Sequence, residues 1–197
     1  EKRGKDIVAL RFGLSEEQNK LVKIIPLSGV YQPRKGNVVI GKVENITFNG
    51  WVIDIDTAEH AFLPLTEVPR YVNKNNLEEV MDIGDLAVVK IWGINKRGID
   101  LSINARGLGT IDEGMIVKVN PNKVPRIIGK EGSMINLIKE ETGCNITVGQ
   151  NGYVWVSGDN VEKELFAKKA IMFVTEKSFV SGLTEKVEEW FEEEKGK

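Results

Sequence analysis

The stretch from residue 35 to residue 106 constrains the fold most, because its apolar residues come in short alternating runs. Clusters of turn-forming residues at 48–50, 83–85 and 96–98 separate these runs. A period of two places successive side chains on opposite faces of a strand. Five short strands without a long helix predict a small closed β-barrel, since an open sheet of this size leaves two unpaired edges. The predicted strands occupy 38–43, 50–56, 61–63, 86–92 and 99–103.

After residue 106 the pattern changes to that of a mixed α and β domain. A strand over 115–119 precedes a short apolar segment at 124–128. Next come Gly129-Lys130-Glu131-Gly132 and an amphipathic helix in which apolar residues recur three and four apart. Gly143 ends this helix.

The second half of this domain contains a hairpin and a long helix. Two strands flank Gly149-Gln150-Asn151-Gly152, whose Asn-Gly pair is a strong hairpin signal. Asp159 is the predicted N-cap of a helix that runs to about Ser178. The predicted order of elements is therefore β-α-α-β-β-α.

The two ends of the chain are too short to form domains of their own. Residues 1–33 contain apolar runs closed by prolines and Gly29, which predict a few short strands that cannot bury a core unaided. Residues 181–197 predict an acidic helix. Its Trp190 and Phe191 either dock on a partner or pack back on their own domain.

Charge and composition exclude several classes of protein. The 197 residues carry 27 Lys and Arg against 29 Asp and Glu, so the chain is no bulk polycation. One cysteine, Cys144, and one histidine, His60, exclude an intrachain disulfide and a Cys/His zinc cluster. We predict no cofactor, no metal and no catalytic residue. No apolar run reaches the ~18 residues of a membrane span, and we expect a cytoplasmic protein without a membrane partner.

The segment around Gly129 and Gly132 carries the strongest functional signal. Two glycines three apart let a backbone turn pass between helices without Cβ atoms, so that phosphodiester oxygens can approach main-chain N–H groups. Arg126 and Lys130 add positive charge beside the loop. The loop and the order of elements together resemble a KH domain, the module that binds single-stranded RNA. Glu131 departs from this pattern, because a carboxylate in the loop weakens phosphate binding.

The predicted barrel combines aromatic and basic residues on its strands and turns. Exposed rings can stack on bases while cations follow the backbone of a single strand. For Phe48 and Trp51, packing in the core or in the hairpin is the alternative, and His60 is interpreted as an ordinary surface residue. The candidate RNA-binding residues of the barrel are Lys42, Phe48, Trp51, Phe62 and Arg97.

Four motifs of the barrel resemble the RNA-binding OB barrel of the S-one type. They are Gly36-x-Val38-x-x-Gly41-Lys42-Val43, Asn49-Gly50-Trp51-Val52-x-x-Ile55, Ala61-Phe62-Leu63-Pro64-Leu65-Thr66 and Asp100-Leu101-Ser102. That family usually has a histidine where this chain has Pro64. The contact made by that histidine is therefore not carried over.

The order of the modules resembles the RNA-binding cap subunits of the archaeal exosome, which have a eukaryotic counterpart. The resemblance implies a trimeric cap, alone or mixed with a second type of cap subunit, on a hexameric ring of RNase PH-like subunits. Such a cap binds single-stranded RNA and guides its 3′ end to the pore for 3′-to-5′ degradation or tailing. The chain itself is then not an enzyme. The alternatives are a self-contained nuclease and an RNA-binding assembly clamp of another RNA-processing complex.

The predicted fold class is mixed α+β and multidomain. It comprises an N-terminal β segment that docks on the ring, a five-stranded OB-type β-barrel, a KH domain and a C-terminal helical tail. The predicted boundaries are 1–33, 34–106, 107–180 and 181–197.

Overall fold

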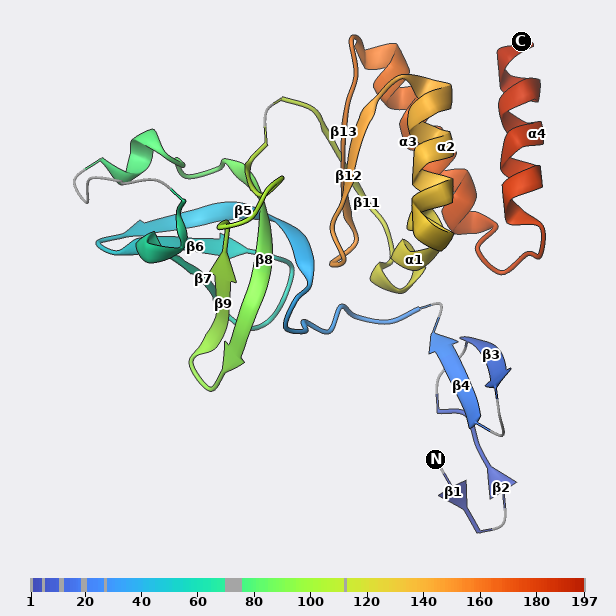
Figure 1. Ribbon diagram of the computed structural model, residues 1–197, viewed down its shortest axis with the longest axis horizontal. Coiled ribbons are helices and arrows are strands. Elements are labelled where there is room, and N and C mark those ends of the chain that lie inside the picture. The colour runs from blue at the N-terminus through green and yellow to red at the C-terminus, as the bar shows by residue number, and fades with distance from the viewer. Residues whose placement is uncertain are drawn as a thin grey trace. The chain divides into compact units, whose positions relative to one another are not determined.

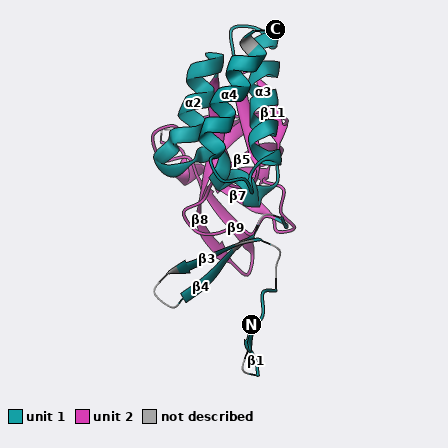
Figure 2. Ribbon diagram, turned by 90° about the vertical axis from the view of Figure 1, so that its right-hand side faces the viewer, with its two compact units in different colours: residues 1–30, 119–144, 158–197 teal, residues 31–118, 145–157 magenta. Residues whose placement is uncertain are grey.

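A computed structural model divides the chain into two compact units (Figure 2). Unit 1 consists of residues 1–30, 119–144 and 158–197, and unit 2 consists of residues 31–118 and 145–157. The helices of the predicted KH segment belong to unit 1 and its strands to unit 2. The residues described are 2–4, 6–10, 13–18, 21–26, 28–69, 76–111 and 113–196.

Unit 2 contains a closed five-stranded barrel of OB type (Figure 1), as predicted. The strands follow the order β8-β5-β6-β7-β9, and β8 also pairs with β9, which closes the barrel. The β7–β9 pair is parallel and the others are antiparallel. A short strand, β10 (Gly109–Thr110), pairs with the free side of β8. The barrel strands are β5 (Val38–Thr47), β6 (Gly50–Asp54), β7 (Ala61–Pro64), β8 (Leu86–Asn95) and β9 (Gly98–Ser102).

Apolar side chains from alternate positions of these strands fill the barrel. Each such side chain contributes roughly 1.5–3 kcal/mol when it is fully buried. Two 3₁₀ turns in the β7–β8 connection, η1 (Leu65–Glu67) and η2 (Leu77–Glu79), add Leu77 to the core. Fully buried members include Val39, Trp51, Ile53, Leu63, Val89, Ile91 and Leu101.

The second sheet of unit 2 has three antiparallel strands in the order β11-β13-β12. They are β11 (Met115–Lys118), β12 (Asn145–Val148) and β13 (Tyr153–Ser157). The turn between β12 and β13 lies at the predicted Asn-Gly pair, Asn151-Gly152.

This turn is hydrogen-bonded to the barrel. The Asn151 amide is fully buried, and its Nδ2 donates to the carbonyl oxygens of Ile40, at 2.7 Å, and of Ile55, at 3.1 Å. Its Oδ1 accepts from the Ile40 N–H at 3.3 Å. At the exposed edge of the contact, Gln150 Oε1 accepts from the Val38 N–H at 3.1 Å. One buried side chain thus satisfies three backbone groups of the barrel.

An ion pair links the two sheets of unit 2 at the surface. Lys118 Nζ lies 2.9 Å from Asp56 Oδ2 and 5.3 Å from the ring centroid of Tyr153. The hydrogen bond to Asp56 raises the pKa of the Lys118 ammonium. Because both side chains are largely exposed, the pair adds little stability.

Unit 1 contains the helices of the KH segment. They are α1 (Val124–Ile128), α2 (Ser133–Thr142) and α3 (Val161–Glu176), with 3₁₀ turns η3 (Pro121–Lys123) and η4 (Lys130–Gly132). Gly143 ends α2 as predicted, with φ 67° and its N–H bonded to the Lys139 carbonyl. The expected element order and the fold class are confirmed.

The predicted N-cap of α3 is wrong by one residue. Asn160, not Asp159, caps the helix, since its Oδ1 accepts from the Lys163 N–H at 2.9 Å. Asp159 instead pairs with the Lys163 ammonium, which lowers the pKa of its carboxyl. The helix also ends at Glu176, two residues before the predicted Ser178.

The acidic tail forms α4 (Leu183–Lys195), which packs on α3 (Figure 1). The Trp190 ring stacks on Phe166 at 5.7 Å and on Phe173 at 5.3 Å between centroids. Phe191 is 1% exposed and meets Phe166 edge to face. Of the two alternatives for this tail, packing on its own domain is therefore the one observed.

The N-terminal segment forms two antiparallel hairpins, as its apolar runs predict. One pairs β1 (Lys2–Arg3) with β2 (Asp6–Ile7), and the other pairs β3 (Gly13–Gln18) with β4 (Leu21–Pro26). Several of its apolar side chains are exposed, namely Ile7, Val8, Leu10, Leu21 and Val22. The four domain boundaries predicted from the sequence stay a prediction.

Candidate nucleic-acid interface

Phe62 lies on the outer face of the barrel. It is in register with Val52 on β6 and with Asp100 on β9, and Val52 is in register with Asn45 on β5. A Cβ atom at Gly50 would lie 2.9 Å from Phe62 Cζ, so glycine makes room for the ring. The ring is half-buried. Part of it is therefore accessible to a base.

The two basic candidates of the barrel are both exposed. Lys42 is exposed and in register with Asp54 at the end of β6. Arg97 is exposed in the β8–β9 turn, where its own N–H donates to Asn95 Oδ1 at 2.8 Å. In β9, the strand after this turn, the Ile99 N–H donates to the His60 carbonyl at 2.9 Å. Lys42 is also in register with Leu86 at the start of β8, whereas Arg97 follows the end of that strand.

Phe48 lies in the β5–β6 turn, and 83% of it is exposed. The Thr47 hydroxyl holds the turn by donating to the Gly50 carbonyl at 2.9 Å. Packing of Phe48 in the core, the alternative to stacking, is not what the structure shows. The ring is therefore available for stacking.

Trp51 is a correction to the predicted site. Its side chain is fully buried in the barrel core, and its indole Nε1 donates to the Met81 carbonyl at 2.9 Å. A ring in this position cannot stack on a base without opening the barrel. Trp51 therefore stabilises the barrel and is removed from the proposed RNA-binding set.

Trp92 is an exposed aromatic residue that sequence reasoning missed. It lies on β8 at a register shift between Ile91 and Gly93, and 47% of it is exposed. A signal for its exposure exists in the sequence, because alternation places it on the same face as the charged Lys90.

The loop between α1 and α2 needs glycine at its first position. Gly129 has φ 75°, and a Cβ atom there would lie 2.6 Å from the Met134 backbone nitrogen. Both the left-handed backbone and the close approach to α2 exclude other residues. The predicted turn between two helices is therefore present.

The rest of the loop bends back through two more left-handed residues. Glu131 has φ 54° and Gly132 has φ 83°. Gly132 precedes α2 as its N-cap residue and supplies no side-chain hydrogen bond to the first turn. The first N–H groups of α2 thus lack a side-chain cap and favour a negatively charged group.

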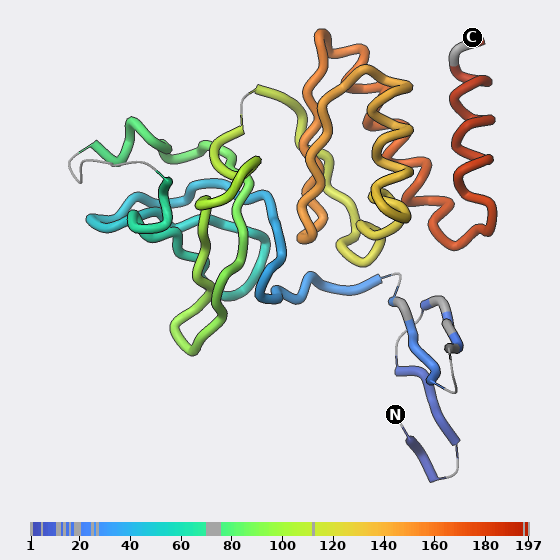
Figure 3. The backbone as a smooth tube through the Cα atoms, in the orientation of Figure 1, coloured from blue at the N-terminus to red at the C-terminus, as the bar shows by residue number. Residues whose placement is uncertain are grey.

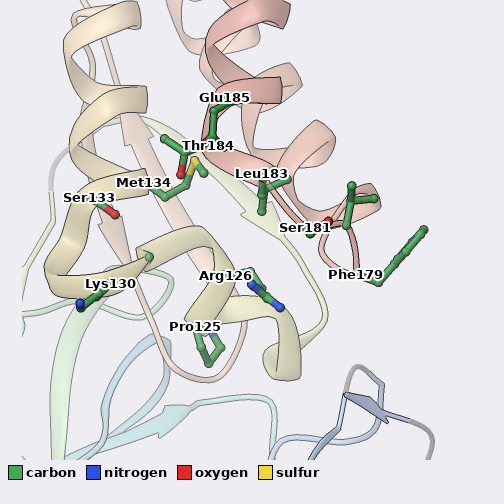
Figure 4. Close-up of a pocket in the computed structure, with 13 residues that line it drawn as sticks. Pro125, Arg126, Lys130, Ser133, Met134, Phe179, Ser181, Leu183, Thr184 and Glu185 are labelled. Carbon is green, nitrogen blue, oxygen red and sulfur yellow. The ribbon is translucent and has the colours of Figure 1, made fainter. Parts of the chain in front are cut away.

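Arg126 and Lys130, the two basic residues of this loop region, line a groove of about 740 Å³ together with the residues that connect α3 to α4. Arg126 points into the groove from α1, whereas Lys130 projects from the other side of the loop (Figure 4). Lys130 is exposed and Arg126 is half-buried. The structure thus brings Arg126, Gly129, Lys130 and Gly132 into one loop region, as predicted.

Two properties of the described residues bear on catalysis and on membranes. No group of three or more His, Cys, Asp or Glu residues in that part of the chain could hold a metal ion. None of its helices is long and apolar enough to cross a membrane.

Comparisons with known proteins agree with the geometry. The KH domain family matches residues 114–162. The chain is 40% identical over 178 residues to the exosome complex component Rrp4 of Methanothermobacter thermautotrophicus, covering 90% of this chain and 57% of that protein. It is 40% identical over 190 residues to the protein of the same name from Nitrosopumilus maritimus, covering 94% of this chain and 84% of that one.

A solved structure is similar over most of the chain. It is described as an exosome complex RNA-binding protein, and its TM-score is 0.75 at 33% identity, covering 85% of this chain and 98% of the other. The chain spans a little over half the length of the first relatives, at 57% and 58%.

Proposed function

Because the chain belongs to the Rrp4 family of exosome complex components, we propose that it is an RNA-binding subunit of the exosome and not itself a nuclease. The observation that carries the proposal is the Gly129–Gly132 loop, whose left-handed backbone precedes the uncapped N-terminus of α2. Such a loop can hold phosphodiester oxygens by main-chain N–H groups. The OB-type barrel supplies a second surface with exposed rings and cations.

In the finer form of the proposal, three copies of the chain cap a hexameric ring of RNase PH-like subunits. A second type of cap subunit can share this position. Each copy binds single-stranded RNA, and together they guide its 3′ end to the pore for 3′-to-5′ degradation or tailing. Weak sites around one entrance raise the local RNA concentration there without tight binding by any single site. We expect this work to take place in the cytoplasm.

The mixed charge of the barrel face supports weak binding by a single copy. Asp54 is in register with Lys42, and Asp100 is in register with Phe62. These carboxylates oppose the attraction that cations exert on a phosphate backbone. Binding should also weaken as salt rises, because phosphate contacts release counterions. An RNA strand that is held weakly in this way can move onward to the ring.

The N-terminal hairpins are the proposed surface that docks on the ring. Ile7 is 77% exposed, Leu21 is 75% exposed and Leu10 is 66% exposed. Apolar side chains of this size are seldom left in water in a continuous segment. Partner subunits that cover them would supply the burial that this segment lacks.

One alternative is a clamp that assembles another RNA-processing complex. In that case RNA binding is secondary, and the loop residues can change without loss of function. The family membership favours the exosome. Copurified partners distinguish the two.

The first test of the proposal is RNA binding by the purified chain. A labelled 20-nucleotide single-stranded RNA is incubated with the chain, magnesium and phosphate, and both retention and RNA length are followed. We expect salt-sensitive retention and no shortening. Shortening by the isolated chain would identify a nuclease instead.

A variant set assigns the binding to the proposed residues. Replacing Lys42, Arg97, Arg126 and Lys130 together with alanine should abolish retention. A control variant with the same charge change replaces exposed lysines outside the proposed interface with alanine, and it should retain RNA. The control positions are Lys23, Lys168, Lys169 and Lys186. Equal retention by both variants would refute the site.

A further inference from the structure

The groove beside the Gly129–Gly132 loop has a second wall that belongs to neither the loop nor the barrel. This wall consists of residues 179–182 of the α3–α4 turn and the first residues of α4, 183–185. The path of the backbone there can be followed in Figure 3. The groove volume of about 740 Å³ falls within the range of ~300–1,000 Å³ for small-ligand pockets. All of its lining residues belong to unit 1. It has the size of a binding site and adjoins a loop that we propose binds phosphate.

Arg126 supplies the positive charge of this groove. It extends from α1 toward the α3–α4 turn (Figure 4). Among the described residues it has neither an ion-pair partner nor a hydrogen-bond partner for its guanidinium. A half-buried guanidinium without a partner can bind a phosphate by donating two parallel hydrogen bonds to its oxygens.

Phe179 supplies an aromatic surface on the opposite wall. Its side chain is 62% exposed and lies at the outer end of the turn (Figure 4). The other aromatic residues near the C-terminus pack together between α3 and α4, and Phe179 takes no part in these ring contacts. An exposed ring and a cation that line one groove are the combination that holds single-stranded nucleic acid.

Two hydrogen bonds constrain the backbone that carries Phe179. Lys123 Nζ, at the start of α1, donates to the Thr175 carbonyl near the end of α3 at 2.8 Å. The Val180 N–H donates to the Lys177 carbonyl at 2.9 Å and closes the turn that carries Phe179. Phe179 and Arg126 therefore line the same groove from segments that are tied together.

The groove wall formed by α4 has one feature that attracts an anion and one that repels it. The first turn of α4 lines the groove and has no side-chain cap, which favours an anion. Glu185 lines the same wall and disfavours one. Removing this carboxylate should strengthen the binding of a phosphate.

We propose that this groove is a second subsite for the RNA strand that the Gly129–Gly132 loop holds. A strand that crosses the loop from the Lys130 side places its next phosphate on Arg126 and stacks the adjoining base on Phe179. The subsite rests on the proposed RNA binding. It extends the bound strand by at least one nucleotide toward α4.

The test compares two oligoadenylates, of four and of twelve nucleotides, by fluorescence anisotropy with the full chain at low salt. Phe179→Ala should weaken binding of the longer RNA by about 5- to 150-fold, the range for loss of one stacked base. Phe179→Trp should keep that affinity, and its added indole fluorescence should be quenched by the RNA. Glu185→Gln should increase the affinity, a gain that a folding defect cannot produce.

Met172→Ala is the matched control. Met172 is a 39% exposed apolar residue on α3 that does not line this groove. This variant should bind the longer RNA as the unmodified chain does. The affinity for the four-nucleotide RNA should differ less between Phe179→Ala and the unmodified chain than the affinity for the longer RNA.

The outcomes separate this inference from the function on which it rests. If the unmodified chain binds neither RNA, the proposed function fails and the subsite fails with it. If the chain binds RNA and Phe179→Ala binds the longer RNA equally well, only the subsite is refuted. The subsite is likewise refuted if Glu185→Gln has no effect and Phe179→Trp shows no quenching.

Discussion

Replacing Asn151 with alanine should destabilise unit 2 far more than its position in a hairpin turn suggests. The substitution removes all three hydrogen bonds of the side chain to the backbone at Ile40 and Ile55. Because Asn151 is 0% exposed, the substitution leaves these backbone groups buried without their partner.

The magnitude follows from these three bonds. Each contributes about 1 kcal/mol net, and a buried group left without a partner costs about 1–3 kcal/mol. Partial entry of water into the space left by the amide offsets some of that cost. We therefore expect the free energy of unfolding to fall by about 3–5 kcal/mol, a large share of the ~5–15 kcal/mol of a typical domain.

Urea unfolding followed by circular dichroism measures this loss, and hydrogen exchange at the Ile40 amide reports it locally. Gln150→Ala is the matched control, since Gln150 is the exposed neighbour and makes one exposed hydrogen bond to the Val38 N–H. Gln150→Ala should lower the free energy of unfolding by less than about 1 kcal/mol. A loss below about 1 kcal/mol for Asn151→Ala, or an equal loss for both variants, would refute the reasoning.

Three further predictions concern α3, α4 and the start of the barrel. Trp190→Ala removes the ring that stacks on two α3 phenylalanines and should lower the free energy of unfolding by about 3–5 kcal/mol in urea; a loss under about 1 kcal/mol would contradict the observed packing of α4. Asn160→Ala should lower the free energy of unfolding by about 1 kcal/mol through loss of the cap, whereas Asp159→Ala should lower it less. The reverse order in thermal unfolding would show that Asp159 is the N-cap, as the sequence predicted. Burial raises the pKa of Tyr31 to about 12 from 10.0; the folded chain then keeps a proton that the unfolded chain loses, so stability falls between pH 10 and 12. Tyr31→Phe should reduce this fall, and identical pH profiles of the two proteins would show that Tyr31 does not contribute to it.

Much of the fold could be predicted from the sequence because its signals are local. Alternation places the five barrel strands, and the glycines at 129, 132 and 143 mark turns that only glycine adopts easily. The N-cap of α3 was missed because Asp159 and Asn160 are neighbouring residues that both cap helices well.

The functional residues were harder to predict because exposure depends on the whole barrel. Trp51 alternates with the buried Ile53 and Ile55, a pattern that indicates the core, but its aromatic character suggested stacking. Phe179 lies in a turn outside any periodic pattern. The contact of Asn151 with Ile40 spans 111 residues of sequence, and local patterns carry no information about it.

The most direct test of the central claim is purification of the native complex through this chain after cross-linking it to RNA in cells. The account predicts that RNase PH-like ring subunits copurify with it, and that RNA is cross-linked at the barrel face and at the loop of residues 129–132. Isolation of the chain with a different RNA-processing complex, or with the ring but without RNA on either surface, would contradict it.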